Sequence, residues 1–217
     1  QRSLALFVAT IAMYVSLDYL PLADAASVQF FAPVLVTLIS GIFLGEKIGK
    51  RRYIAVIVAF CGVLIIVQPG IEFRWAMLLP LIAAFMLAIF LIQTRALQSF
   101  DNAYTTLFYS TLIGAIVFII VIPSFWRQPT SEEWFFMVVQ GSLGAIGHLA
   151  IIKALKYSTA SFLAPFLYSQ LLVAIILSVM YLGDPVTIMM CLGAFLIMAS
   201  GIYIWYREVF LINVGSP

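Results

Sequence analysis

Few residues in this 217-residue chain have side chains that could do acid–base, nucleophilic or metal chemistry. The chain has one histidine, His148, and two cysteines, Cys61 and Cys191, which fall inside apolar runs where a small buried thiol is the ordinary role. It has no Cys-x-x-Cys pair, no paired carboxylates within an apolar run and no glycine-rich phosphate loop. Metal binding, hydrolysis and redox catalysis depend on such clusters. We therefore expect a protein that is not an enzyme, with no cofactor and no metal site.

The polar side chains that remain are neutral and lie singly within apolar runs. Gln140, Gly144 and His148 follow at four-residue spacing, so on a helix they form one slowly turning stripe. A polar stripe with a gap in it suits the wall of a cavity that binds a small molecule. Gly141, Gly144 and Gly147 lie in the same stretch, and close packing between helices is the competing interpretation. The other candidates for substrate binding, which contacts between helices explain equally well, are Tyr14, Gln29, Tyr109, Tyr168 and Gln170.

Two acidic residues and two prolines are candidate gating residues. Glu46 and Asp184 each follow a glycine at the end of an apolar run. A carboxylate there more often caps a helix, pairs with a basic turn or closes a mouth than it binds substrate at mid-depth. Pro33 and Pro165 lie inside apolar runs, where each removes a backbone donor and bends the helix. For the prolines, a fixed bend without any hinge role is the alternative.

Composition indicates that the elements holding these residues are membrane helices. The chain is 65% hydrophobic and 9% charged, with a mean hydropathy of +1.15. Apolar runs of about twenty residues, which is the length that crosses a bilayer as a helix, occur throughout. A net charge of +2 is too small to indicate a nucleic-acid partner. The pattern predicts an all-α polytopic helical bundle that spans the lipid bilayer with eight helices, at 3–20, 23–44, 52–68, 74–95, 104–123, 132–152, 159–182 and 186–206.

The basic residues predict the orientation of this bundle. When turns are assigned alternately to the two sides, one side receives Arg2, Lys47, Lys50, Arg51, Arg52, Arg95, Lys153, Lys156 and Arg207. The other side receives only Arg74 and Arg127. Because Lys and Arg are concentrated in cytoplasmic turns, we expect both observed ends of the chain in the cytoplasm.

The chain also carries a long internal repeat. Leu17-Asp18-Tyr19 and Gly45-Glu46 reappear as Leu155-Lys156-Tyr157 and Gly183-Asp184, each 138 positions further along. Five membrane crossings separate the two Gly-acid pairs, and because five is odd the pairs face opposite sides of the bilayer. Inverted repeats of this kind are what secondary transporters use for alternating access. If five helices make one repeat, the second copy is complete and the first shows three helices.

The residues around these motifs resemble EamA-type members of the drug/metabolite transporter superfamily. In the first half the resemblance lies in Phe30-Phe31-Ala32-Pro33, Leu44-Gly45-Glu46, the basic turn, and Gly62-Val63-Leu64-Ile65. In the second half it lies in Gly147-His148-Leu149, Ala154-Leu155, Ala160-Ser161, Ala164-Pro165-Phe166, Tyr168 with Gln170, Gly183-Asp184 and Ser200-Gly201-Ile202-Tyr203. Asp184 stands where the family usually has Glu.

The resemblance implies a ten-helix, five-plus-five carrier of the bacterial inner membrane, with a central cavity and small organic metabolites as substrates. On this scheme residues 1–70 are the last three helices of the first repeat, 71–210 are the complete second repeat and 211–217 are a tail. Two helices would then be missing before Gln1. Among subgroups, the chain is most similar to those for S-adenosylmethionine or riboflavin uptake and to those described simply as permeases.

The expected function is therefore secondary transport by alternating access, in which two repeats rock about a cavity in the middle of the membrane. An integral-membrane enzyme, a channel and a non-transporting scaffold are the alternatives. An enzyme would need polar clusters at a membrane interface, and a channel would need symmetric rings of pore residues. Proton coupling and a homodimer are left open by the sequence.

Overall fold

The structure, a computed structural model, describes residues 1–43, 50–68, 74–97, 100, 102–157, 170–171, 173–183 and 186–207. These ranges are helical throughout apart from short turns and contain no strand, which confirms an all-α bundle. Four of the helices are long and apolar enough to cross a membrane, and four shorter apolar helices accompany them. The elements are α1 (Arg2–Ser16), α2 (Leu22–Gln29), α3 (Ala32–Phe43), α4 (Lys50–Val67), η1 (Trp75–Met77), α5 (Leu78–Ala96), α6 (Ala103–Val121), η2 (Ile122–Phe125), α7 (Ser131–Tyr157), η3 (Ser178–Leu182) and α9 (Ile188–Tyr206).

One membrane helix is broken near its middle. The sequence predicts a single helix over 23–44, whereas the structure has α2 and α3 with a short turn between them. Pro33 explains the break, because it has no N–H to donate to the carbonyl of Gln29 and its ring would clash with that carbonyl in a straight helix. At the break the N–H of Phe31 donates to the carbonyl of Val28 at 3.1 Å, a tighter turn than an α-helix makes. The bend expected at Pro33 is therefore present.

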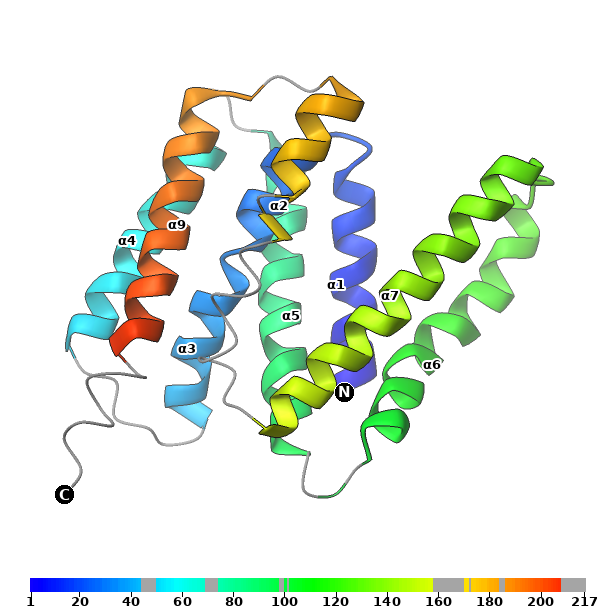
Figure 1. The fold of residues 1–217 in the computed structure, drawn as a ribbon, viewed down its shortest axis with the longest axis horizontal. Coiled ribbons are helices and arrows are strands. Elements are labelled where there is room, and N and C mark those ends of the chain that lie inside the picture. Colours follow the sequence, from blue (N-terminus) through cyan, green and yellow to red (C-terminus); the bar gives the residue numbers. More distant parts are fainter. Residues whose placement is uncertain are drawn as a thin grey trace.

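The last helices of the two halves, α4 and α9, pack side by side (Figure 1). The contact is made through two glycines. A Cβ atom on Gly62 would lie 2.8 Å from the carbonyl oxygen of Gly193, and one on Gly193 would lie 2.5 Å from the carbonyl oxygen of Gly62. Backbone thus meets backbone, which is how small residues bring membrane helices close together.

The expectation that both cysteines are buried is wrong, because Cys61 and Cys191 are exposed. The geometry of the α4–α9 contact explains their exposure. Successive residues on a helix are about 100° apart, so Cys61 cannot share the face of Gly62, and Cys191 lies about 200° from Gly193. Because α4 and α9 meet through the glycines, both thiols point away from the contact.

On the other side of the bundle, α5 lies against α1, and α6 packs on α1 and on α7 (Figure 1). A cluster of buried residues joins α1, α3, α5 and α7 through Leu6, Val36, Phe90 and Leu155. The buried residues of α7 are Ile152 and Leu155, both near its C-terminal end. Its N-terminal end leans away from α1 (Figure 1). We therefore describe α7 as a helix that is anchored at one end.

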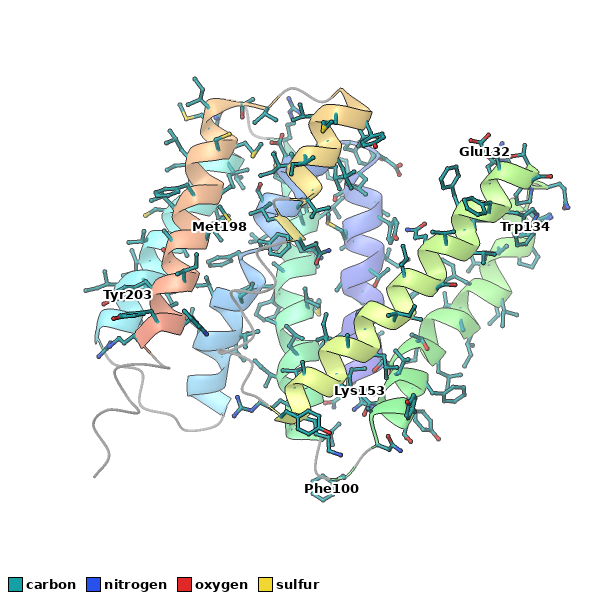
Figure 2. The ribbon with its side chains drawn as sticks, in the orientation of Figure 1. Phe100, Glu132, Trp134, Lys153, Met198 and Tyr203 are labelled. Atoms are coloured by element: carbon teal, nitrogen blue, oxygen red, sulfur yellow. The ribbon has the colours of Figure 1, made fainter. Side chains whose placement is uncertain are left out.

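The two ends of the bundle differ in charge. We call them the Lys153 end and the Glu132 end, after the residues that mark the two ends of α7 in Figure 2. The helix ends and turns in the described ranges place eight basic residues at the Lys153 end, namely Arg2, Lys50, Arg51, Arg52, Arg95, Lys153, Lys156 and Arg207. Arg74 and Arg127 fall at the Glu132 end. The alternation predicted from the sequence is therefore present in the described helices.

The Glu132 end of α7 is closed by a reciprocal cap. The backbone N–H of Thr130 donates to the carboxylate of Glu133 at 2.8 Å, and the Glu133 N–H donates to the Thr130 hydroxyl at 3.2 Å. The Arg127 guanidinium pairs with the same carboxylate. This capping box satisfies backbone donors that have no partner within the helix, and it fixes where α7 begins.

Candidate functional site

Two of the candidate binding residues, Tyr14 and Gln140, meet between α1 and α7. The Gln140 side-chain amide donates a hydrogen bond to the Tyr14 hydroxyl. Both side chains are exposed, with 54% of Tyr14 accessible. The bond joins the first half of the chain to the second half through two long side chains, and not through packed backbones.

The face of α7 next to Gln140 is open. A Cβ atom on Gly141, Gly144 or Gly147 would meet nothing within 4 Å. Close packing at these glycines is therefore not found in the described part of the chain. In the stripe of Gln140, Gly144 and His148, the first residue is bridged to α1 and the middle position is unfilled.

His148 lies about 12 Å along α7 from Gln140, at the rise of a standard helix. Its ring packs edge-on against Phe90 of α5, with centroids 6.2 Å apart and planes at 87°. The Nδ1 atom is buried and has no hydrogen-bond partner in the described part of the chain. A buried polar atom without a partner costs about 1–3 kcal/mol, so a ligand that bonded to Nδ1 would recover part of that cost.

Sequence reasoning missed two buried polar residues on α5, the helix that His148 contacts through Phe90. Gln93 and Thr94 follow Phe90 by about one helical turn on α5. The Oε1 atom of Gln93 and the Oγ1 atom of Thr94 are buried without a hydrogen-bond partner among the described residues, and Thr94 is 1% exposed. They stand next to Arg95 and so resemble the polar end of a span. The sequence did contain a sign of them, because the amide of Gln93 and the hydroxyl of Thr94 come directly before Arg95 within one apolar helix.

Two further hydrogen bonds join the halves. The Ser178 hydroxyl, which is buried, accepts from the N–H of Ala23 at 3.3 Å. Ala23 lies in the first turn of α2, where backbone donors have no partner within the helix, and the N-cap Pro21 makes no side-chain cap. Ser178 therefore caps α2 from a distant part of the chain. The Ser3 hydroxyl donates to the carbonyl of Tyr109. A single serine in an apolar run was the only sequence signal for Ser178.

The remaining candidates are not brought to this stripe. Gln29 is half-buried at the end of α2, Tyr109 is 53% exposed on α6, and Gln170 is exposed. In the described ranges no side-chain hydrogen bond links these three to Tyr14, Gln140 or His148. Pro33 is buried in α3. Four candidates lie outside the described residues, namely Glu46, Pro165, Tyr168 and Asp184. Within the described ranges no three His, Cys, Asp or Glu residues group to hold a metal ion.

Known proteins resemble this chain over most of its length. The model of the EamA-like transporter family matches residues 3–68 and 74–206. The riboflavin transporter of Vibrio cholerae serotype O1 is 29% identical over 191 residues, which are 87% of this chain and 64% of that protein. The S-adenosylmethionine uptake transporter of Rickettsia bellii is 27% identical over 208 residues, which are 95% of this chain and 72% of that protein.

A solved crystal structure superposes with a TM-score of 0.64 at 18% identity, covering 98% of this chain and 76% of that one. At this identity the likeness shows the fold alone. The chain spans less than two thirds of the riboflavin transporter's length. The chain is a helical bundle, and the two matches to the family model together cover nearly all of its residues. The chain therefore belongs to the EamA-like transporter family.

Proposed function

We propose that this chain forms part of a secondary transporter that moves small organic metabolites across a bacterial inner membrane by alternating access. The observation that carries the proposal is the family match on both halves of the chain. Relatives named for riboflavin and S-adenosylmethionine support a substrate of that size. Residues 1–70 and 71–210 are the proposed repeats, and the Lys153 end is the proposed cytoplasmic end.

The contacts between the halves suggest how the repeats move. The α4–α9 contact brings backbone against backbone and is rigid for that reason. On the opposite side of the bundle, Tyr14 and Gln140 hold α1 and α7 together by one exposed hydrogen bond. Rocking therefore pivots near Gly62 and Gly193. It breaks this hydrogen bond and shifts the packing of α1 on α5 and α6. The bend at Pro33 absorbs part of the motion, and Glu46 and Asp184 close alternate mouths.

The substrate path in this proposal follows the stripe from Gln140 to His148. An amide, a phenol and an imidazole are costly to expose to lipid, so in the membrane these side chains face water or protein. Tyr14 and Gln140 make the first contacts, and the unpartnered Nδ1 of His148 bonds substrate deeper in the path. Gln93 is added to the proposed substrate-binding residues because its Oε1 atom is also buried without a hydrogen-bond partner among the described residues. Gln29, Tyr109, Tyr168 and Gln170 remain proposed contacts in other states of the cycle.

A ligand-stabilisation screen tests the proposal. Purified protein is melted with amino acids, nucleosides and vitamins, with riboflavin and S-adenosylmethionine among them. A substrate raises the melting temperature by mass action whatever the direction of transport. The compound that does so is then assayed in proteoliposomes, with and without a pH gradient. Saturable flux stimulated by substrate on the far side supports the proposal, and chemical turnover of the compound without flux would favour an enzyme.

A further inference from the structure

The short π-helical turn η3 is exposed except at its first residue. Ser178 is 0% exposed, whereas the four residues that follow it are between 47% and 79% exposed. The turn lies at the same end of the bundle as the start of α2 (Figure 1). The side chain of Ser178 is therefore the part of η3 that enters the bundle.

The partner of Ser178 is the first turn of α2. The Ala23 N–H donates to the Ser178 hydroxyl at 3.3 Å, and it belongs to the first turn, where a helix has no acceptor of its own. Ala23 is 1% exposed, so its N–H is shielded from water while η3 lies on it. Most residues of α2 are buried, and the helix packs on α4, α5 and α9. In this contact α2 is the fixed partner and η3 is the exposed one.

Ser178 also belongs to the internal repeat. The residues that match across 138 positions are Ser178, Leu182, Gly183 and Asp184 in the second half and Ser40, Leu44, Gly45 and Glu46 in the first. Within η3 the backbone joins the serine to the glycine, because the Gly183 N–H donates to the Ser178 carbonyl. Single π turns of this kind are frequent at functional sites. Ser178 thus ties the end of the span that carries the Gly-acid pair to α2.

We infer that Ser178 is a positioning residue of the transport cycle, whose hydroxyl holds η3 against α2 and keeps the Glu132 end of the bundle closed. This role rests on the proposed alternating access, and it names a contact that differs between the closed and the open Glu132 end. When η3 lifts away from α2, water reaches the Ala23 N–H and takes the place of the serine. The donor is then satisfied in both states, so the hydrogen bond can be exchanged at little cost.

Removal of the hydroxyl should favour the open state. In Ser178→Ala the Ala23 N–H is buried without a partner when η3 is closed, but water satisfies it when η3 is open. Because only the closed state is penalised, the ratio of open to closed molecules should rise about tenfold.

Ser27→Ala is the matched control. Ser27 is also fully buried, and its hydroxyl donates to the carbonyl of the same Ala23 at 2.7 Å. Since that bond lies within α2, it is unaffected by the position of η3. Ser27→Ala should therefore leave the ratio of open to closed molecules unchanged.

The distance between two spin labels measures where η3 lies. Asp18→Cys, which follows α1, and Met180→Cys on η3 are both at exposed positions. They are introduced into the full chain after Cys61 and Cys191 are replaced by alanine, and the labelled protein is studied in lipid nanodiscs. Ser178→Ala should raise the ratio of long to short distances about tenfold, in line with the penalty on the closed state.

A second pair of labels detects general loosening of the bundle. In a chain with no introduced cysteine, labels on the native Cys61 and Cys191 report the α4–α9 contact, and Ser178→Ala should leave their distances unchanged. A change at both pairs of labels would make Ser178 a merely structural residue. Equal shifts in Ser178→Ala and Ser27→Ala, or no shift in Ser178→Ala, would also overturn the inference.

Hydrogen exchange tests the contact without any substitution. The Ala23 amide should exchange more slowly than the amide of Thr105, which lies at an exposed position in the first turn of α6. Equally fast exchange of the two amides would show that Ser178 does not hold η3 closed.

Neither the label distances nor the exchange rates require a substrate. An absent shift in a chain that shows saturable flux therefore counts against the role of Ser178 alone. The expected shift in a chain that transports no compound supports the contact and counts against the proposed function.

Discussion

At the level of single residues, the hydrogen bond from Gln140 to Tyr14 is the interaction most open to direct test. Tyr14→Phe and Gln140→Leu each remove it, and a single exposed bond is worth about 0.5–1.5 kcal/mol. We expect the double variant to lose no more stability than either single variant, which a double-mutant cycle on thermal unfolding would measure. Strictly additive losses would mean that the two side chains act separately.

His148 is expected to bind substrate and not to stabilise the fold. His148→Leu removes a buried nitrogen that has no partner among the described residues, so the melting temperature of the ligand-free protein should stay the same or rise. The dissociation constant of the compound found in the screen should rise about tenfold, which corresponds to one hydrogen bond of about 1.4 kcal/mol. His148→Gln serves as the control, because it keeps a polar group at that depth. A large fall in melting temperature with unchanged affinity would instead make His148 a structural residue.

Residue types predicted part of this site. Tyr14 and Gln140 were both identified by their polarity within apolar runs, but their pairing depends on the lean of α7, which no local pattern encodes. Ser178 and Gln93 were missed because one serine, or one amide beside a charge, is common in membrane helices. The cysteines were placed wrongly because hydropathy does not distinguish a face that meets protein from a face that meets lipid.

At the level of helices, the glycines divide into closely packed and open positions. Gly193→Ala should destabilise the chain by about 1–3 kcal/mol, because the new methyl group meets the Gly62 carbonyl and the backbones must separate. Gly144→Ala has open space around it and should be neutral or stabilising by up to about 1 kcal/mol, as alanine favours the helix. Thermal melting of the two variants side by side checks the pair. Equal destabilisation would show that Gly144 is packed as tightly as Gly193.

Helix positions were largely predictable, because twenty apolar residues between polar turns leave few alternatives in a membrane. The shape of the helices, meaning where they bend or break, was less predictable than their positions. The run over 23–44 has the composition of one helix, and only Pro33 signals that it becomes α2 and α3. The predicted end of the helix at 152 fell short of Tyr157, where α7 ends, because Lys153 and Lys156 interrupt the apolar pattern but not the backbone hydrogen bonds.

For the whole molecule, the orientation in the membrane can be measured directly. In a chain with Cys61 and Cys191 replaced by alanine, Thr130→Cys should react with an impermeant maleimide in intact cells, and Lys50→Cys should react only after lysis. The expected result follows from the excess of Lys and Arg at the Lys153 end. Labelling of Lys50→Cys in intact cells would reverse the orientation.

The inverted repeat stays a prediction, which rests on two short motifs and an odd number of expected crossings between them. The relative tilt of helices, the α4–α9 contact and the open face of α7 were not predictable from the sequence, since each depends on packing between segments more than a hundred residues apart. Family resemblance gave the expected class of protein, while the substrate depends on a few side chains whose arrangement varies within such folds.

The bond between Tyr14 and Gln140 also bears on how fast and how often α7 leaves α1. Exposed side chains change rotamer within picoseconds to nanoseconds, whereas collective motions of helices take microseconds to milliseconds. One such bond therefore breaks and re-forms many times before α7 could swing away from α1. Its strength contributes to the fraction of molecules in which α7 is joined to α1, and the rate of return from the separated state is set by the slower movement of the helix. In relaxation or single-molecule measurements, Tyr14→Phe should then change the dwell time of the joined state and leave that of the separated state as it was.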